Sequence, residues 1–234
     1  MGMSLAMNNV ISQPEPVLTS VGAPWLKCVT ALEVALIYAG ILLYIWRWQF
    51  THPQVWMILF ALVLVSHVAR RDRLASMGLA LDGLRASAQV ALPLALLLFV
   101  PGIIYGFAHR SLLVIPPGSA VLASFAMYGI WCVFQQYLMQ SYFHQRLMSL
   151  SENRYLTSAL VALMFGAAHI PNLILMAATT AGGFMLAQIF ARHRNVWPLA
   201  LAQTVGGFLI AALSPASIIH NMRVGPGYFF FDLR

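Results

Sequence analysis

Three glutamines, Gln135, Gln136 and Gln140, interrupt an apolar stretch of this chain, and His169 follows in the next apolar stretch. Polar side chains are costly to bury in hydrocarbon, so such a group marks either a seam between packed helices or a functional pocket. An amide forms hydrogen bonds but does not act as a proton-transfer base near neutral pH. Hydrogen bonding is therefore the main chemistry that these residues offer, and the histidine is the titratable member of the set.

Gln136, Gln140 and His144 are spaced by four residues, which predicts that they share one face of a helix. Such a stripe has a structural interpretation, as a set of interhelical hydrogen bonds, and a functional one, as the lining of a retained ligand or partner pocket. Both interpretations stay open at this point.

The composition indicates that membrane helices position these residues. Of 234 residues, 61% are hydrophobic and 8% are charged, whereas soluble domains carry roughly 25% charged residues. The mean hydropathy is +0.80. The formal net charge of +7 falls on short loops between apolar runs, which favours membrane lipids over nucleic acid as the partner. We therefore predict an all-α, polytopic transmembrane helix bundle.

Charge-poor runs of suitable length predict about seven spans, with a possible eighth near the end. The seven runs cover residues 28–46, 54–69, 88–107, 119–142, 155–171, 173–191 and 196–213. These limits predict a polar N-terminal segment at 1–27, a single membrane-embedded domain at 28–213 and an interfacial tail at 214–234.

Loop charges predict the orientation. A cytoplasmic N-terminus places nine Lys and Arg residues inside and four outside, as the positive-inside rule favours. We predict an integral protein of the cell (inner) membrane with its N-terminus in the cytoplasm. Residues 70–85, where apolar and basic residues alternate, form either an amphipathic interfacial stretch or a solvated loop.

Phe165 and His169 form a Phe-x-x-x-His motif, and Trp197-Pro198 follows at a fixed distance. With the paired glutamines, these residues resemble the motifs of the CPBP family of intramembrane proteases, which includes CAAX-processing and bacteriocin-associated, Abi-type proteins. The family carries paired glutamates with an arginine four residues later, then Phe-x-x-x-His, then His-x-x-x-Asn after Trp-Pro. The resemblance extends over about residues 70–213.

The chain departs from the family at most of the positions expected to form its active site. Gln135 and Gln136 stand where the family has glutamates, and Gln140 where it has arginine. Gln203 replaces the histidine of the third motif and Gly207 its asparagine. The family is thought to activate water with a glutamate and the histidines, directly or through a bound metal. Glutamine keeps the length and hydrogen bonding of glutamate but removes its proton acceptor, so we predict impaired catalysis.

Glu33 is the one acidic residue within a predicted span. An intramembrane carboxylate is a functional candidate by default, and Glu33 could serve as an unconventional base if the first helix packed beside His169. Alternatively, it lies about 9 Å along the helix from Lys27, near enough to the boundary to reach water or a headgroup.

Three functions follow as hypotheses. The first is a degenerate family member that acts as a membrane scaffold or accessory factor. The second is an active endopeptidase that uses His169 and an unconventional base on CAAX-type or other membrane-associated peptides. The third is a lipophilic-ligand binder or transporter. Partners would be lipids and either a membrane protein or a prenylated peptide, and Gly102 and Gly106 allow an oligomer. The seven histidines show no metal-ligand spacing, so we predict no cofactor.

Overall fold

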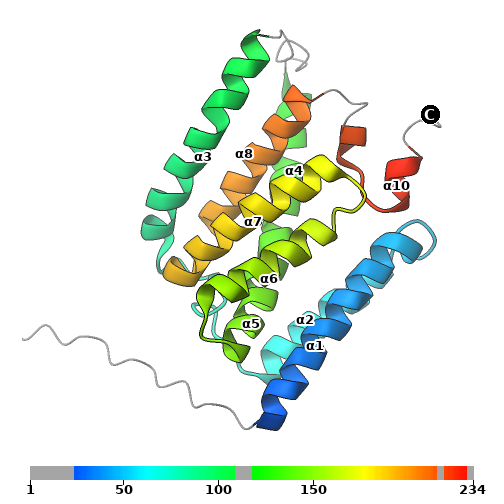
Figure 1. Cartoon of the computed structure of the whole chain (residues 1–234), viewed down its shortest axis with the longest axis vertical. Coiled ribbons are helices and arrows are strands. Elements are labelled where there is room, and N and C mark those ends of the chain that lie inside the picture. Colours follow the sequence, from blue (N-terminus) through cyan, green and yellow to red (C-terminus); the bar gives the residue numbers. More distant parts are fainter. Residues whose placement is uncertain (1–23, 109–117, 215–218, 231–234) are drawn as a thin grey trace, which may run out of the picture.

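A computed structural model describes residues 24–108, 118–214 and 219–230, and Figure 1 shows that the described chain is built from helices. The prediction of an all-α protein is confirmed. Most of the predicted N-terminal segment lies outside the described residues, and its end already belongs to the first helix. Residues 215–218 and 231–234 of the predicted tail also lie outside them.

The helices follow the apolar runs of the sequence. In order, they are α1 (Pro24–Leu43), η1 (Tyr44–Trp48), α2 (Val55–Ala69), α3 (Leu84–Ala108), α4 (Ser119–Gln136), η3 (Tyr137–His144), α5 (Gln145–Leu150), α6 (Arg154–Ala167), α7 (Leu173–His193), α8 (Trp197–Leu213), η4 (His220–Met222) and α10 (Pro226–Phe229). Local signals set several ends: the side chains of Asn153 and Asn172 accept backbone hydrogen bonds at the starts of α6 and α7, and Pro198 lies in the first turn of α8.

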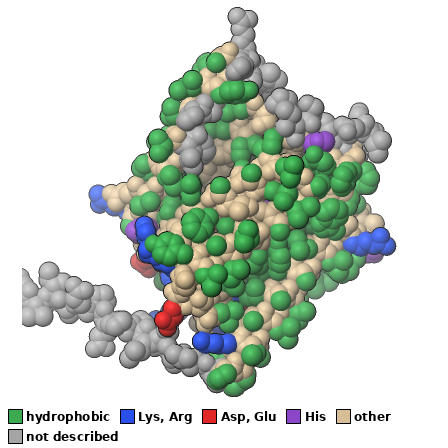
Figure 2. Space-filling view, viewed as in Figure 1, with side chains coloured by type: hydrophobic (Ala, Val, Ile, Leu, Met, Phe, Trp, Pro, Cys, Tyr) green, Lys and Arg blue, Asp and Glu red, His purple; other side chains and the backbone are tan. Residues whose placement is uncertain are grey.

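The core of the bundle is formed by α3, α4, α6, α7 and α8. α6 packs along α7, while α8 lies against both α3 and α4 (Figure 1). The α1–α2 pair flanks this core and contacts it through α5. Figure 2 shows a face dominated by hydrophobic side chains, with the charged ones at its margins, as expected of a surface in contact with lipid.

Three helical segments are long and apolar enough to cross a membrane: Pro24–Trp48, Val121–Leu150 and Leu173–His193. The helices at 55–69, 154–167 and 197–213 are apolar but shorter. The chain is therefore a membrane protein by the composition of its helices, whereas the finer count of seven spans stays a prediction.

The segment that carries the glutamines is one continuous helix with a change of winding. It starts as α4, becomes a π-helix in η3 directly after Gln136, and returns to α-helical winding in α5. π-helical turns are rare and are frequently found at functional sites. The changed winding rotates Gln140 and the residues after it relative to the face that Gln136 presents.

The loop at 70–83 consists of turns that fold onto the end of α7. The backbone N–H of Val196 donates to the carbonyl of Gly78, and Asn195 Nδ2 donates to the carbonyls of Ala80 and Asp82. Met77 is buried there. The stretch predicted as interfacial or solvated is thus partly buried against the helices.

Candidate functional site

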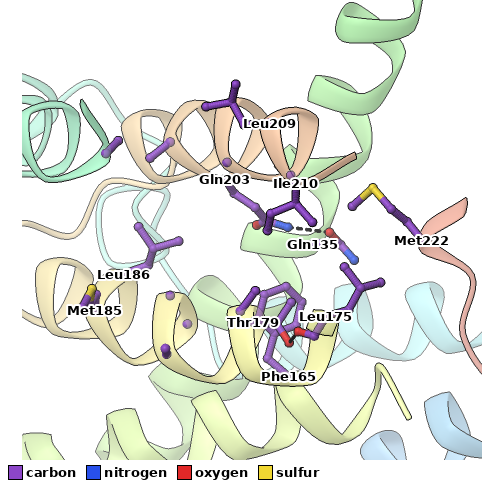
Figure 3. Close-up of a pocket in the computed structure, with 18 of the residues that line it drawn as sticks. Gln135, Phe165, Leu175, Thr179, Met185, Leu186, Gln203, Leu209, Ile210 and Met222 are labelled. Carbon is purple, nitrogen blue, oxygen red and sulfur yellow. Dashed lines mark hydrogen bonds between the residues drawn. The ribbon is translucent and has the colours of Figure 1, made fainter. Parts of the chain in front are cut away.

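Three glutamine side chains meet between α4 and α8. Gln136 Nε2 donates to Gln203 Oε1 at 2.6 Å, and Gln203 Nε2 donates to Gln135 Oε1 at 2.6 Å. Figure 3 shows Gln203 and Gln135 facing each other across the space between the two helices. We call this chain of hydrogen bonds the amide relay. It joins the substituted positions of the first motif to the substituted histidine position of the third.

The relay has a buried end and an open end. Gln136 is fully buried, and its Oε1 has no hydrogen-bond partner among the described residues. Gln135 is half-buried, and its Nε2 lies on the far side of its amide from Gln203 (Figure 3). Because each amide in the relay donates to the next, the relay has a direction and ends on an N–H donor at Gln135.

His169 lies in the turn between α6 and α7. Its Nδ1 is 2.7 Å from the carbonyl oxygen of Phe165, and its ring packs edge-on against the Phe165 ring with centroids 5.0 Å apart. A carbonyl only accepts hydrogen bonds, so Nδ1 carries the hydrogen and Nε2 of the neutral ring keeps its lone pair. Phe165 therefore fixes both the tautomer and the orientation of the histidine.

A cavity of about 610 Å³ brings the two motifs together. Gln135, Gln203, Gly207 and His169 all line it, and Figure 3 shows α7 and α8 on opposite sides of it. Its other described lining is mainly apolar, and no Asp, Glu, Lys or Arg is among the lining residues that the structure describes. The site is therefore an electrically neutral, largely apolar pocket with a few polar groups.

Tyr128 packs directly against Gly207, one of the motif positions. A Cβ atom at Gly207, where the family has asparagine, would collide with the hydroxyl group and ring of Tyr128. Both residues line the cavity. Sequence analysis missed Tyr128 because it lies in α4, outside every motif, and nothing in its immediate sequence marks it.

Gln140 lies away from the cavity. It is buried, and its Oε1 accepts from His144 Nδ1 at 3.0 Å. His144 Nε2 in turn lies 3.4 Å from the hydroxyl of Thr157 and 3.3 Å from that of Ser158 on α6. Gln140 and His144 do meet as their spacing predicts, whereas Gln136 bonds to α8. The pair joins η3 to α6.

Glu33 likewise belongs to another cluster. Its carboxylate accepts hydrogen bonds from Ser66 and Arg70 and, at 2.8 Å, from the hydroxyl of Tyr142. Arg146 Nε lies 3.6 Å from the same carboxylate. Glu33 is not among the residues that line the cavity containing His169.

Arg146 extends this cluster to the loop after α2. Its Nη2 donates to Asp72 Oδ2 at 2.6 Å, and the same oxygen lies 2.7 Å from His67 Nδ1. Burial alone would raise the pKa of Asp72, but hydrogen bonds from Arg146 and His67 hold that pKa below its ordinary value. Sequence analysis missed these three residues, because their partners are far apart in the chain. We call Glu33, Arg70, Asp72, His67 and Arg146 the ion-pair cluster.

The residues at the cavity do not fit a catalytic metal. Such a site usually takes three ligands from His, Cys, Asp and Glu, and the cavity offers one imidazole beside amides. Within residues 24–108, 118–214 and 219–230, no group of three such side chains could hold a metal ion.

The described residues form an all-helical membrane protein in which two glutamines and a histidine line one cavity. Residues 117–209 match the family model "Type II CAAX prenyl endopeptidase Rce1-like". The match covers less than half of the chain but extends from α4 into α8 and includes all the motif positions. It confirms the predicted resemblance to the CAAX-type proteases of the CPBP family. No curated protein and no solved structure matches the chain significantly.

Proposed function

We propose that this CAAX-protease-like membrane protein does not hydrolyse peptides and acts as a membrane scaffold or accessory factor without a cofactor. The observation that carries the proposal is the amide relay. The side chains of Gln135, Gln136 and Gln203 form hydrogen bonds with one another at positions where the family has two glutamates and a histidine. Peptide hydrolysis needs a proton acceptor that activates water, and none of these amides is one.

The geometry of the relay explains why the three positions differ from the family together. Gln203 accepts from one neighbour and donates to the other. Two glutamates only accept, so one of them would face the Gln203 carbonyl oxygen. A histidine at this position, once protonated, donates from both ring nitrogens and suits two carboxylates. Donors and acceptors at these three positions therefore match either in a set of two acids with a histidine or in a set of three amides.

The test is peptide cleavage by the purified, membrane-reconstituted protein on prenylated CAAX peptides and a mixed peptide library. We expect no cleavage by the natural chain. The triple variant Gln135→Glu, Gln136→Glu, Gln203→His restores the acids and the histidine, and His169→Ala in that background is its matched control. Cleavage by the triple variant that His169→Ala abolishes supports a disarmed pocket. Cleavage by the natural chain that His169→Ala abolishes contradicts the proposal.

The proposed topology places the ion-pair cluster on the cytoplasmic side. The basic residues at the start of α1, in the loop at 70–83 and at the end of α7 share one end of the bundle, as the contact of Arg194 Nη1 with the Ser76 carbonyl illustrates. This asymmetry supports a cytoplasmic N-terminus. Labelling of Ser76→Cys in inside-out vesicles but not in intact cells is the expected result, and the reverse pattern contradicts it.

A further inference from the structure

We propose that the cavity beside the amide relay binds an uncharged long-chain alcohol, with its hydroxyl group between Gln135 and His169 and its chain along the apolar wall. This inference rests on the proposed function in one respect, because it treats the pocket as a binding site where no peptide is cleaved. The occupant is identified by three properties of the cavity: its charge, its free hydrogen-bonding atoms and its walls.

The charge of the cavity excludes anionic occupants. No described lining residue is charged, and an ionised group buried without a partner is strongly unfavourable. Gln140, at the position of the family's arginine, bonds to His144 outside the cavity and is itself neutral. A phosphate or a peptide carboxylate would therefore find no cation here.

Two of the polar residues that line the cavity, Gln135 and His169, together match one group that both donates and accepts. Gln135 Oε1 is taken by Gln203, which leaves the Gln135 Nε2 donor. His169 Nδ1 is taken by Phe165, which leaves the Nε2 acceptor. A hydroxyl group supplies an acceptor to the amide and a donor to the imidazole, whereas a ketone or ester only accepts and an alkane does neither.

The walls suit a hydrocarbon chain. Figure 3 shows Leu175, Leu186, Leu209 and Ile210 around the cavity, and its volume of about 610 Å³ is typical of ligand sites. A chain that enters from the bilayer gains little from this apolar lining, because lipid tails are equally apolar. The polar headgroup, rather than the hydrocarbon chain, therefore determines which lipophilic molecule the cavity selects.

Gly182 offers a way to fill the cavity without disturbing its walls. It lines the cavity, and a Cβ atom at this position would meet nothing within 4 Å. Gly182→Phe therefore projects a ring into the open space, whereas Gly182→Ala adds one methyl group and serves as the matched control. Both changes replace glycine inside a helix, which favours the helix.

The experiment is photo-crosslinking in phosphatidylcholine nanodiscs with a sixteen-carbon alcohol that carries a mid-chain diazirine, followed by mass spectrometry of the labelled peptides. We expect saturable labelling of α7 and α8 that excess hexadecan-1-ol suppresses and that hexadecane and hexadecyl phosphate do not. Gly182→Phe should reduce labelling at least tenfold and Gly182→Ala less than twofold. Gln135→Leu should weaken competition by the alcohol about fivefold, the effect of one neutral hydrogen bond.

Equal competition by hexadecane overturns the proposed role of Gln135 and His169, and full labelling of a folded Gly182→Phe variant overturns the site. Thermal unfolding of both Gly182 variants establishes that they fold, and Gln135→Leu gives a second test that does not depend on them. Peptide cleavage by the natural chain with intact alcohol binding would refute the proposed function alone. Absent binding with absent cleavage would refute this inference alone.

Discussion

The direction of the amide relay predicts different effects of the same substitution at neighbouring positions. Gln136 donates to Gln203, whereas Gln135 accepts from it. Gln136→Glu replaces a donor by an acceptor and sets two oxygen atoms against each other at the buried end of the relay. Gln135→Glu keeps an acceptor where the structure has one, at a half-buried position beside the cavity.

The magnitude follows from the burial of Gln136, whose side chain is enclosed. Loss of its hydrogen bond removes about 1 kcal/mol, and a buried acceptor without a partner costs about 1–3 kcal/mol more, with the upper end appropriate to a charged group. A total of about 3 kcal/mol corresponds to a fall in Tm of about 6–12 °C for a chain of this size. Gln135→Glu should lower Tm by less than half of that.

Thermal unfolding of the detergent-solubilised variants at pH 7 measures the difference. Adding Gln203→His to Gln136→Glu should recover stability, because a protonated imidazole donates toward both neighbours. Equal falls in Tm for the two glutamate variants, or no recovery on adding the histidine, would refute the directional relay.

Three further predictions concern stability. Arg146→Met should lower Tm by about 6–12 °C, because it removes a buried guanidinium that pairs with Asp72. Arg70→Met, at a more exposed pair, should lower Tm by less than about 4 °C. Equal shifts would contradict this assignment. The pKa of Asp72 is lowered on folding, so the ionised carboxylate stabilises the fold above its ordinary pKa near 4, and this stabilisation is lost as pH falls through the folded pKa. When Tm is measured from pH 7 to pH 3, it should therefore fall further in the natural chain than in Asp72→Asn. Gly207→Ala should lower Tm by about 2–10 °C because it collides with the ring facing it, and Gly182→Ala, with open space around it, should not.

The fold class could be predicted from composition because hydrophobic runs with few charges have few structural solutions in a membrane. The helix limits were also close: the run predicted at 54–69 is α2 (Val55–Ala69), and that at 196–213 is α8 (Trp197–Leu213). The π-helical winding after Gln136 could not be predicted, because it depends on how one long helix packs against several neighbours rather than on local propensity. The fold of residues 70–83 onto α7 depends on tertiary contacts for the same reason.

The candidate site could be predicted as a set of positions but not as an arrangement. Motif spacing identified Gln135, Gln203 and His169, and the structure places all three around one cavity. The spacing by four did predict that Gln140 meets His144, but it also placed Gln136 on the same face, whereas Gln136 bonds to Gln203 on α8. Motif spacing did not identify Tyr128, whose contact with position 207 joins two helices.

The neutral amides also suit the position of the cavity, because no residue of the ion-pair cluster lines it. In the structure, the cluster pairs Glu33 with Arg70, and Asp72 with Arg146, at one end of the bundle. A charge at the cavity would have to find its partner within the cavity itself, because the charged groups of the cluster are already paired with one another. Restoring one acid there adds an unpaired charge, whereas restoring both acids with the histidine supplies its own counter-charge. Catalytic competence should therefore return only when all three positions change.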